Sequence, residues 1–141
     1  MDETDTRLIG ALQRNARAPL AVLARALGLS RTTVQSRLDR LERSGMIGGY
    51  TVSLGDAYTR NQILAYVLIT VSHRQSAAVV AAARKMPQVL SLLSVSGAFD
   101  LIAKVAAPSV AQMDAVIDTL GALEGVERTT SSVVLSKKID R

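Results

Sequence analysis

The first third of the chain owes its fold to the stretch Gly28-Leu29-Ser30-Arg31-Thr32-Thr33-Val34-Gln35-Ser36-Arg37-Leu38-Asp39-Arg40-Leu41. Within it, Gly28 can take the left-handed conformation that ends a helix, and the Ser30 hydroxyl can cap the helix that follows. Apolar residues recur in it at spacings of four and three: Val34, Leu38 and Leu41. These spacings place the three residues on one face of a helix. We therefore predict a helix at residues 31–44, joined to an earlier helix by a turn of about three residues.

Two helices are predicted before this turn. Asp2 can cap the first, and Asp5, three residues later, favours its first turn. Pro19 suits the first turn of the second. The inward faces consist of Leu8, Ile9 and Leu12 in the first helix and of Leu20, Leu23, Ala24 and Leu27 in the second. Together the three helices predict a helix-turn-helix domain over residues 1–50, whose last helix would enter the major groove of DNA.

The outward face of the helix at 31–44 is polar and basic. It carries hydrogen-bond donors and acceptors but no acidic group, its members being Arg31, Thr32, Thr33, Gln35, Ser36 and Arg40. Residues 20–50 hold five arginines against Asp39 and Glu42, which is an excess of three positive charges in a chain of net charge +5. An arginine-rich helix surface is usually only a solvated face. The turn chemistry, the clean division of faces and the local charge together favour DNA binding.

Roles on this face follow from chemistry. Arg31 and Arg40 are expected to contact phosphates, and Gln35 can pair with adenine through two hydrogen bonds. Arg37 lies at the edge of the inward face, so it is also a candidate for tying the helix to its own domain. The predicted DNA-binding residues are Ser30, Arg31, Thr32, Thr33, Gln35, Ser36, Arg37 and Arg40.

Composition excludes most enzyme chemistry. The chain of 141 residues has no cysteine and one histidine, His73, so disulfides, cysteine nucleophiles and sites built on several Cys or His ligands are ruled out. Aromatic residues make up only 3%, which leaves little platform for single-stranded nucleic acid but does not hinder reading of a duplex. We predict a protein that is not an enzyme, with no catalytic residue, no metal and no cofactor.

Two features argue against export and membrane insertion. The first residues, Met1-Asp2-Glu3, are acidic where a secretory signal is basic, and no apolar run follows them. The longest strongly apolar stretch, residues 63–71, is about half as long as the ~18 residues that a transmembrane helix requires. We expect a cytoplasmic protein without a membrane partner.

A second module follows, with the order strand, helix, strand, strand, helix, strand. Its strands are predicted at residues 62–72, 89–96, 99–106 and 126–136, and its helices at 75–86 and 109–123. Residues 51–61 are the most polar and turn-like segment and form a linker, so that the module covers residues 62–141. The βαββαβ order predicts a ferredoxin-like α+β domain, with both helices on one face of the sheet.

The predicted strands are apolar on both faces. The run Ile63-Leu64-Ala65-Tyr66-Val67-Leu68-Ile69 shows no alternation with polar residues. One layer of helices covers only one face of a sheet, so the other face must pack on another subunit. We therefore predict an obligate oligomer, with a symmetric homodimer as the default.

The chain resembles the Lrp/AsnC (feast/famine) family of bacterial and archaeal transcriptional regulators over its whole length. The resemblance rests on the order and spacing of short matches: Leu27-Gly-Leu-Ser30, Val34-Gln-Ser-Arg37, Leu41-Glu42, Gly45-Met-Ile47, Gly49-Tyr50 and Val95-Ser-Gly97-Ala-Phe-Asp100. It implies a winged or extended helix-turn-helix domain and an effector domain that dimerises sheet to sheet, with octamers or other higher oligomers common. It also implies an amino acid or related metabolite bound between dimers near residues 97–100.

The chemistry of that loop suits an amino acid. Gly97 allows a tight turn with exposed backbone donors, and Asp100 offers an acceptor for an ammonium group. Thr129 and Ser131 lie two residues apart, hence on one side of a strand, where their hydroxyls can bond a carboxylate. The predicted effector-binding residues are Ser96, Gly97, Ala98, Phe99, Asp100, Thr129 and Ser131. The alternative is a plain hairpin turn in which Asp100 bonds nearby backbone.

The function predicted from these residues and the resemblance is sequence-specific DNA-binding transcriptional regulation, modulated by an amino acid or related small metabolite. The expected partners are double-stranded DNA, that effector, and further copies of the chain. Two alternatives stay open. One is a DNA-organising protein of the same fold without a ligand. The other is a small-molecule enzyme built on the second module, which the shortage of acid–base residues disfavours.

Overall fold

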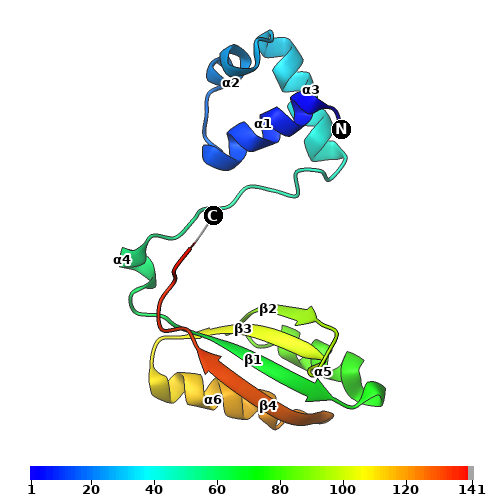
Figure 1. Ribbon diagram of the computed structural model, residues 1–141, viewed down its shortest axis with the longest axis vertical. Helices are drawn as coiled ribbons and strands as arrows, with labels where there is room; N and C mark the ends of the chain where they lie inside the picture. The colour runs from blue at the N-terminus through cyan, green and yellow to red at the C-terminus, as the bar shows by residue number, and fades with distance from the viewer. Residues whose placement is uncertain (140–141) are drawn as a thin grey trace. The chain divides into compact units, whose positions relative to one another are not determined.

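The computed structural model describes residues 1–139 and divides the chain into two compact units, one covering Met1–Ser53 and the other beginning at Leu54. The first unit consists of α1 (Glu3–Arg14), α2 (Leu20–Leu27) and α3 (Arg31–Arg43) (Figure 1). Its core is formed by Leu8, Leu12, Leu23, Ala24, Leu27, Val34 and Leu41. These are the inward faces that the apolar spacing predicts.

The turn between α2 and α3 has the predicted chemistry. Gly28 takes a left-handed φ of 69°, which a side chain would strain, and its N–H donates to the last turn of α2. The Ser30 hydroxyl oxygen accepts a hydrogen bond from the backbone N–H of Thr33 at 3.1 Å and so caps α3. Residues 1–53 contain three helices and no strand, so this unit forms a helix-turn-helix without a wing of its own.

The second unit contains one four-stranded antiparallel sheet and two main helices. After the short helix α4 (Asp56–Thr59), the elements are β1 (Ile63–Val71), the 3-10 turn η1 (His73–Gln75), α5 (Ser76–Arg84), β2 (Val89–Ser94), β3 (Leu101–Ala107), α6 (Val110–Gly121) and β4 (Val126–Val133). The strand order is β2-β3-β1-β4, and α5 and α6 lie on the same side of the sheet (Figure 1). The predicted ferredoxin-like βαββαβ domain is confirmed.

The two faces of the sheet differ in burial. Alternate residues of β1 and β3, such as Val67 and Ala103, are fully buried beneath α5 and α6. The opposite side, which we call the open face, has an apolar centre. Tyr66 on it is 42% exposed and Leu93 58% exposed, and the pairing register places Leu93, Ile102 and Leu68 in one row.

Several predicted boundaries were wrong by a few residues. β2 ends at Ser94 rather than at residue 96, β3 begins at Leu101 rather than at 99, and β4 ends at Val133 rather than at 136. Gly97, with φ of 108°, turns the chain between β2 and β3, so the residues on either side of it leave the sheet early. The linker also contains α4, where the sequence predicts only turns.

Candidate functional site

The outward face of α3 is exposed as predicted, and several of its side chains already have partners. Ser30 and Thr33 share a hydrogen bond between their hydroxyl oxygens at 2.8 Å, next to the helix cap. The Gln35 amide nitrogen donates to Asp39 Oδ1 at 2.6 Å, which leaves the amide oxygen available. Reading adenine through two hydrogen bonds therefore requires Gln35 to release Asp39. Within residues 1–139, partners are absent for the side chains of Arg31, Thr32 and Ser36.

Two arginines of α3 are held by the start of α1. Arg37 Nη1 donates to Asp2 Oδ2 at 2.7 Å and to Asp5 Oδ1 at 2.8 Å. Arg40 Nη2 donates to the other oxygen, Asp5 Oδ2, at 2.7 Å. Arg37, a candidate both for DNA and for tying the helix to its own domain, makes the second kind of contact in the structure. Arg40, expected on phosphate, also binds Asp5, although 56% of its side chain stays exposed.

Asp5 is the centre of this cluster, which we call the Asp5 clamp and define as Asp2, Asp5, Arg37 and Arg40. The Asp5 side chain is 1% exposed and accepts from both arginines, while Asp2 and Asp5 also cap α1 reciprocally through each other's backbone N–H. A buried carboxylate is stable only when it is paired and hydrogen-bonded in this way. The clamp therefore fixes the position of α3 on α1.

The hydrogen bonds of the clamp shift the pKa values of Asp2, Asp5 and Arg37. The hydrogen bond from Arg37 lowers the pKa of Asp2 below its ordinary value of 3.8. The pKa of Asp5 is also lowered, first by the hydrogen bond from the Asp2 backbone N–H and then by Arg37, although burial opposes the shift. The same bonds raise the pKa of Arg37. All of these groups are charged at neutral pH.

Our sequence predictions missed the role of Asp5, although a signal for it exists. Asp5 precedes Leu8 by three residues, and Leu8 precedes Leu12 by four, so all three lie on the inward stripe of α1. An acidic residue on an apolar stripe needs a cation from a neighbouring element. The arginines at the edge of α3 are the obvious source.

A further hydrogen bond joins α3 to the segment that follows it. The Tyr50 hydroxyl donates to Glu42 Oε1 at 2.7 Å. Desolvation of the hydroxyl and its hydrogen bond to the Glu42 carboxylate raise the pKa of Tyr50 to about 12, so the hydroxyl remains a donor at neutral pH. Tyr50 thereby attaches the start of the linker to the helix that carries the candidate DNA-binding residues.

The loop between β2 and β3 forms the second candidate site, with Ser96, Gly97, Ala98, Phe99 and Asp100 at its centre. The Asp100 N–H donates to the Ile69 carbonyl at 2.9 Å, and Asp100 Oδ2 accepts from the Val71 N–H at 2.9 Å. The carboxylate thus binds the loop to the end of β1. It does not bond the backbone of its own turn, as a plain hairpin turn would require. The other carboxylate oxygen, Asp100 Oδ1, has no hydrogen bond or ion pair within the described residues.

The structure separates Thr129 and Ser131 from this loop. Both lie on the helix side of β4, because the register pairs them with the buried residues Ile69 and Val67. Thr129 also lies beneath α6, where a Cβ atom placed on Gly121 would come within 3.8 Å of the Thr129 hydroxyl oxygen. The expectation that these two hydroxyls face the loop is therefore corrected.

Arg128, which sequence reasoning did not select, is the β4 residue that meets the loop. It lies on the opposite side of the strand from Thr129, in register with Thr70, and its guanidinium carbon lies 5.9 Å from the centre of the Phe99 ring. This contact spans β1, because β1 separates β3 from β4 in the sheet. Thr130 and Ser132 flank the same open face.

Two other classes of feature are absent from residues 1–139. No group of three or more His, Cys, Asp or Glu side chains in this range is placed to hold a metal ion. None of the helices in the same range is long and apolar enough to cross a membrane.

Comparisons with known proteins agree with both units. Residues 1–42 match the AsnC-type helix-turn-helix domain, and residues 64–141 match the Lrp/AsnC ligand binding domain. An HTH-type transcriptional regulator of Mycobacterium tuberculosis is 34% identical over 142 residues, which covers 100% of this chain and 96% of that protein.

Solved structures extend the comparison to the fold. A transcriptional regulator of Neisseria meningitidis, solved as a complex with L-Met, has a TM-score of 0.87 and 28% identity, covering 100% of this chain and 93% of that one. E. coli AsnC reaches a TM-score of 0.91 at 22% identity, covering 100% and 96%, which supports the shared fold.

Proposed function

The chain belongs to the Lrp/AsnC family of transcriptional regulators, with a helix-turn-helix domain and a ligand-binding domain, and we propose that it binds DNA sequence-specifically under the control of an amino acid or related small metabolite. The observation that carries the DNA-binding part is the exposed donor face of α3, which the Asp5 clamp holds in a fixed position. A helix docked this firmly can present side chains to base edges at constant geometry.

In the proposed complex each α3 lies in a major groove, and two subunits read half-sites about 34 to 36 Å apart. Arg31, whose guanidinium has no partner within the described residues, contacts phosphate, and so does the exposed part of Arg40. Thr32 and Ser36 reach base edges, while Ser30, Thr33 and Arg37 position the helix. Gln35 exchanges Asp39 for a base.

Binding of labelled duplexes from the protein's own promoter region, followed by fluorescence anisotropy and footprinting, tests this proposal. Gln35→Ala should relax the preference at one base position, with a discrimination loss of about 1 to 3 kcal/mol. Arg40→Ala should weaken binding to all sequences alike. Equal affinity for specific and random duplexes would instead support a DNA-organising role.

The effector part of the proposal is supported by the matched ligand binding domain and by the related Neisseria meningitidis regulator whose structure contains L-Met. The loop at residues 96–100 presents backbone donors and an Asp100 oxygen, Oδ1, that is available within the described residues. A thermal-shift screen against all amino acids should identify a stabilising ligand. Asp100→Ala should keep DNA binding and lose the response to that ligand, and an unchanged response would remove Asp100 from the site.

We also propose that the open face of the sheet packs against the same face of a second copy, with octamers or other higher oligomers built from such dimers. The support is the row of Leu93, Ile102 and Leu68, which no element of residues 1–139 covers. Leu68→Lys should reduce the mass measured by light scattering, because a charge in an apolar interface lacks a partner. Val110→Lys, at a residue 76% exposed on α6, is the matched control and should leave the mass unchanged.

A further inference from the structure

Two opposite charges approach the end of β1 from its two neighbouring strands. On one side Asp100, just before β3, bonds the Val71 N–H through Oδ2. On the other side Arg128 of β4 is in register with Thr70. Neighbouring strands lie about 4.8 Å apart, so β3 and β4 flank β1 with about 10 Å between them. Asp100 and Arg128 form no ion pair with each other in the described part of the chain.

The guanidinium of Arg128 is presented on the side where the loop lies. The guanidinium carbon lies 5.9 Å from the centre of the Phe99 ring, and Phe99 is the residue immediately before Asp100. A guanidinium over an aromatic ring keeps its N–H groups at the ring's edge available to a second partner. Residues 1–139 supply no carboxylate to these N–H groups.

Thr70 lies between the two charges. It follows Ile69, to whose carbonyl Asp100 donates, and it is the register partner of Arg128. Its hydroxyl oxygen is buried and has no hydrogen-bond partner within the described residues, although buried polar atoms in proteins are nearly always bonded. An acceptor brought in beside Arg128 would satisfy this hydroxyl.

We infer that Arg128 is the residue that binds the carboxylate of the proposed amino-acid effector. This inference rests on the proposed effector function and deepens it. The ammonium group binds Asp100 Oδ1, the carboxylate takes the guanidinium fork of Arg128 in two hydrogen bonds, and the Thr70 hydroxyl donates to the same carboxylate. Arg128 and Thr70 thus replace Thr129 and Ser131 in the carboxylate role.

The test uses the full chain and three probes derived from one amino acid. A thermal-shift screen of the wild type selects the L-amino acid that stabilises it most, and calorimetry then compares this acid with its α-carboxamide and its decarboxylated amine. Removing the carboxylate should weaken binding to the wild type about tenfold or more, as expected for a charge-assisted bidentate contact. Arg128→Gln should lose about the same factor for the acid and should no longer distinguish acid from carboxamide.

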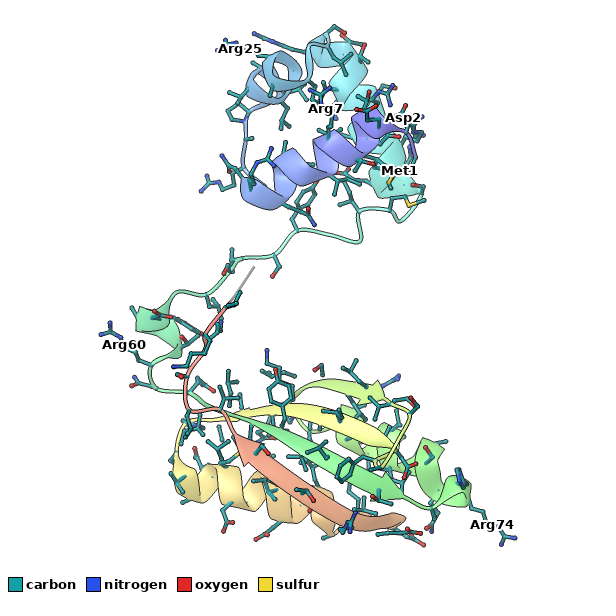
Figure 2. All side chains as sticks on the ribbon, in the orientation of Figure 1. Met1, Asp2, Arg7, Arg25, Arg60 and Arg74 are labelled. Carbon is teal, nitrogen blue, oxygen red and sulfur yellow. The ribbon has the colours of Figure 1, made fainter. Side chains whose placement is uncertain are left out.

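Two further variants serve as controls. Arg74→Gln removes the same charge from an exposed arginine that points away from the sheet after β1, and it should bind the acid like the wild type (Figure 2). Arg128→Lys keeps the charge but lacks the fork, so it should recover part of the lost affinity. It also provides the measurement if Arg128→Gln fails to fold.

The outcomes separate the inference from the proposed function. Wild-type protein that responds to none of the amino acids would overturn the effector function, and this inference with it. A wild-type response that Arg128→Gln and Arg128→Lys leave unchanged would overturn the role of Arg128 alone. So would an equal affinity of the wild type for the acid and its carboxamide.

Discussion

The two units of the protein use opposite charges in contrasting ways. In the helical unit, Asp2 and Asp5 accept hydrogen bonds from Arg37 and Arg40 in three ion pairs of 2.7 to 2.8 Å. The Asp5 side chain at the centre of these pairs is 1% exposed. In the sheet unit, Asp100 and Arg128 flank the same end of β1 and remain apart. Paired charges fix two helices in place, whereas separated charges are available to a ligand. The charge pairing therefore distinguishes the unit in which charges join two helices from the unit in which we propose that charges hold a ligand.

The largest effect is expected from removing the centre of the paired set. Asp5→Asn leaves Arg37 and Arg40 without their shared carboxylate, so the melting temperature should fall by several degrees and DNA affinity should drop about tenfold. The loss of affinity would occur although the variant loses a negative charge, which by itself should favour binding to DNA. Differential scanning calorimetry and fluorescence anisotropy measure the two effects.

Glu3→Gln is the control for this variant, because Glu3 is an exposed acid in the same turn of α1 and the charge change is identical. It should melt like the wild type and bind DNA equally or slightly more tightly. If Asp5→Asn remains folded and binds DNA as tightly as Glu3→Gln, the clamp does not position α3.

Acid should weaken the helical unit through the same groups. The pKa values of Asp2 and Asp5 lie below 3.8 in the folded protein, so the unfolded chain binds protons more tightly than the folded one. Their contribution to stability is therefore complete above about pH 4 and is lost as the pH falls further, through the lowered pKa values. Melting temperatures measured from pH 6 to pH 3 should decline less steeply for Asp5→Asn. Parallel curves for variant and wild type would contradict this origin.

A smaller effect should separate paired from unpaired arginines on α3. Arg31 has no partner among the described residues, whereas Arg40 shares its charge with Asp5. Arg31→Gln should therefore reduce the slope of log affinity against log salt by about 0.9, and Arg40→Gln by less. Anisotropy titrations from 50 to 200 mM salt distinguish the two, and a larger change for Arg40→Gln would reverse this ranking.

The smallest effect is expected at the separated charges. Without ligand, Arg128→Gln should leave the melting temperature within about 1 °C of the wild type, because an exposed, unpaired arginine contributes little to stability. Arg37→Gln, which breaks two contacts of the clamp, should lower it clearly. Similar losses from both variants would erase the contrast between the two units.

The features that were predicted correctly from the sequence are those determined by neighbouring residues. The left-handed Gly28, the Ser30 cap and the apolar stripe of α3 all involve residues within a few positions of one another. The order of strands and helices in the second unit follows from periodicity and from Pro and Gly punctuation in the same way. The strand ends were less accurate, because Gly97 and the bonds of Asp100 draw residues 95–100 out of the sheet.

The features that were not predicted from the sequence are contacts between residues far apart in the chain. Arg40 and Asp5 are 35 positions apart and meet only because α1 packs on α3. The period of two correctly placed Thr129 and Ser131 on one side of their strand, but it does not say which side the helices cover. The contact between Arg128 and Phe99 depends on the pairing register of β4 as well as on the strand order, and no local pattern reveals that register.

The hydrogen bond from Tyr50 to Glu42 sets the length of the connection between the units. Because it binds the chain to α3 as far as residue 50, only residues 51–55 lie between this bond and the start of α4. Five residues reach at most about 18 Å when fully extended. If the chain dimerises as proposed, each helix-turn-helix unit is joined to its sheet unit through this short segment, and insertion of half a helical turn of DNA between the half-sites should exceed what the two segments can span.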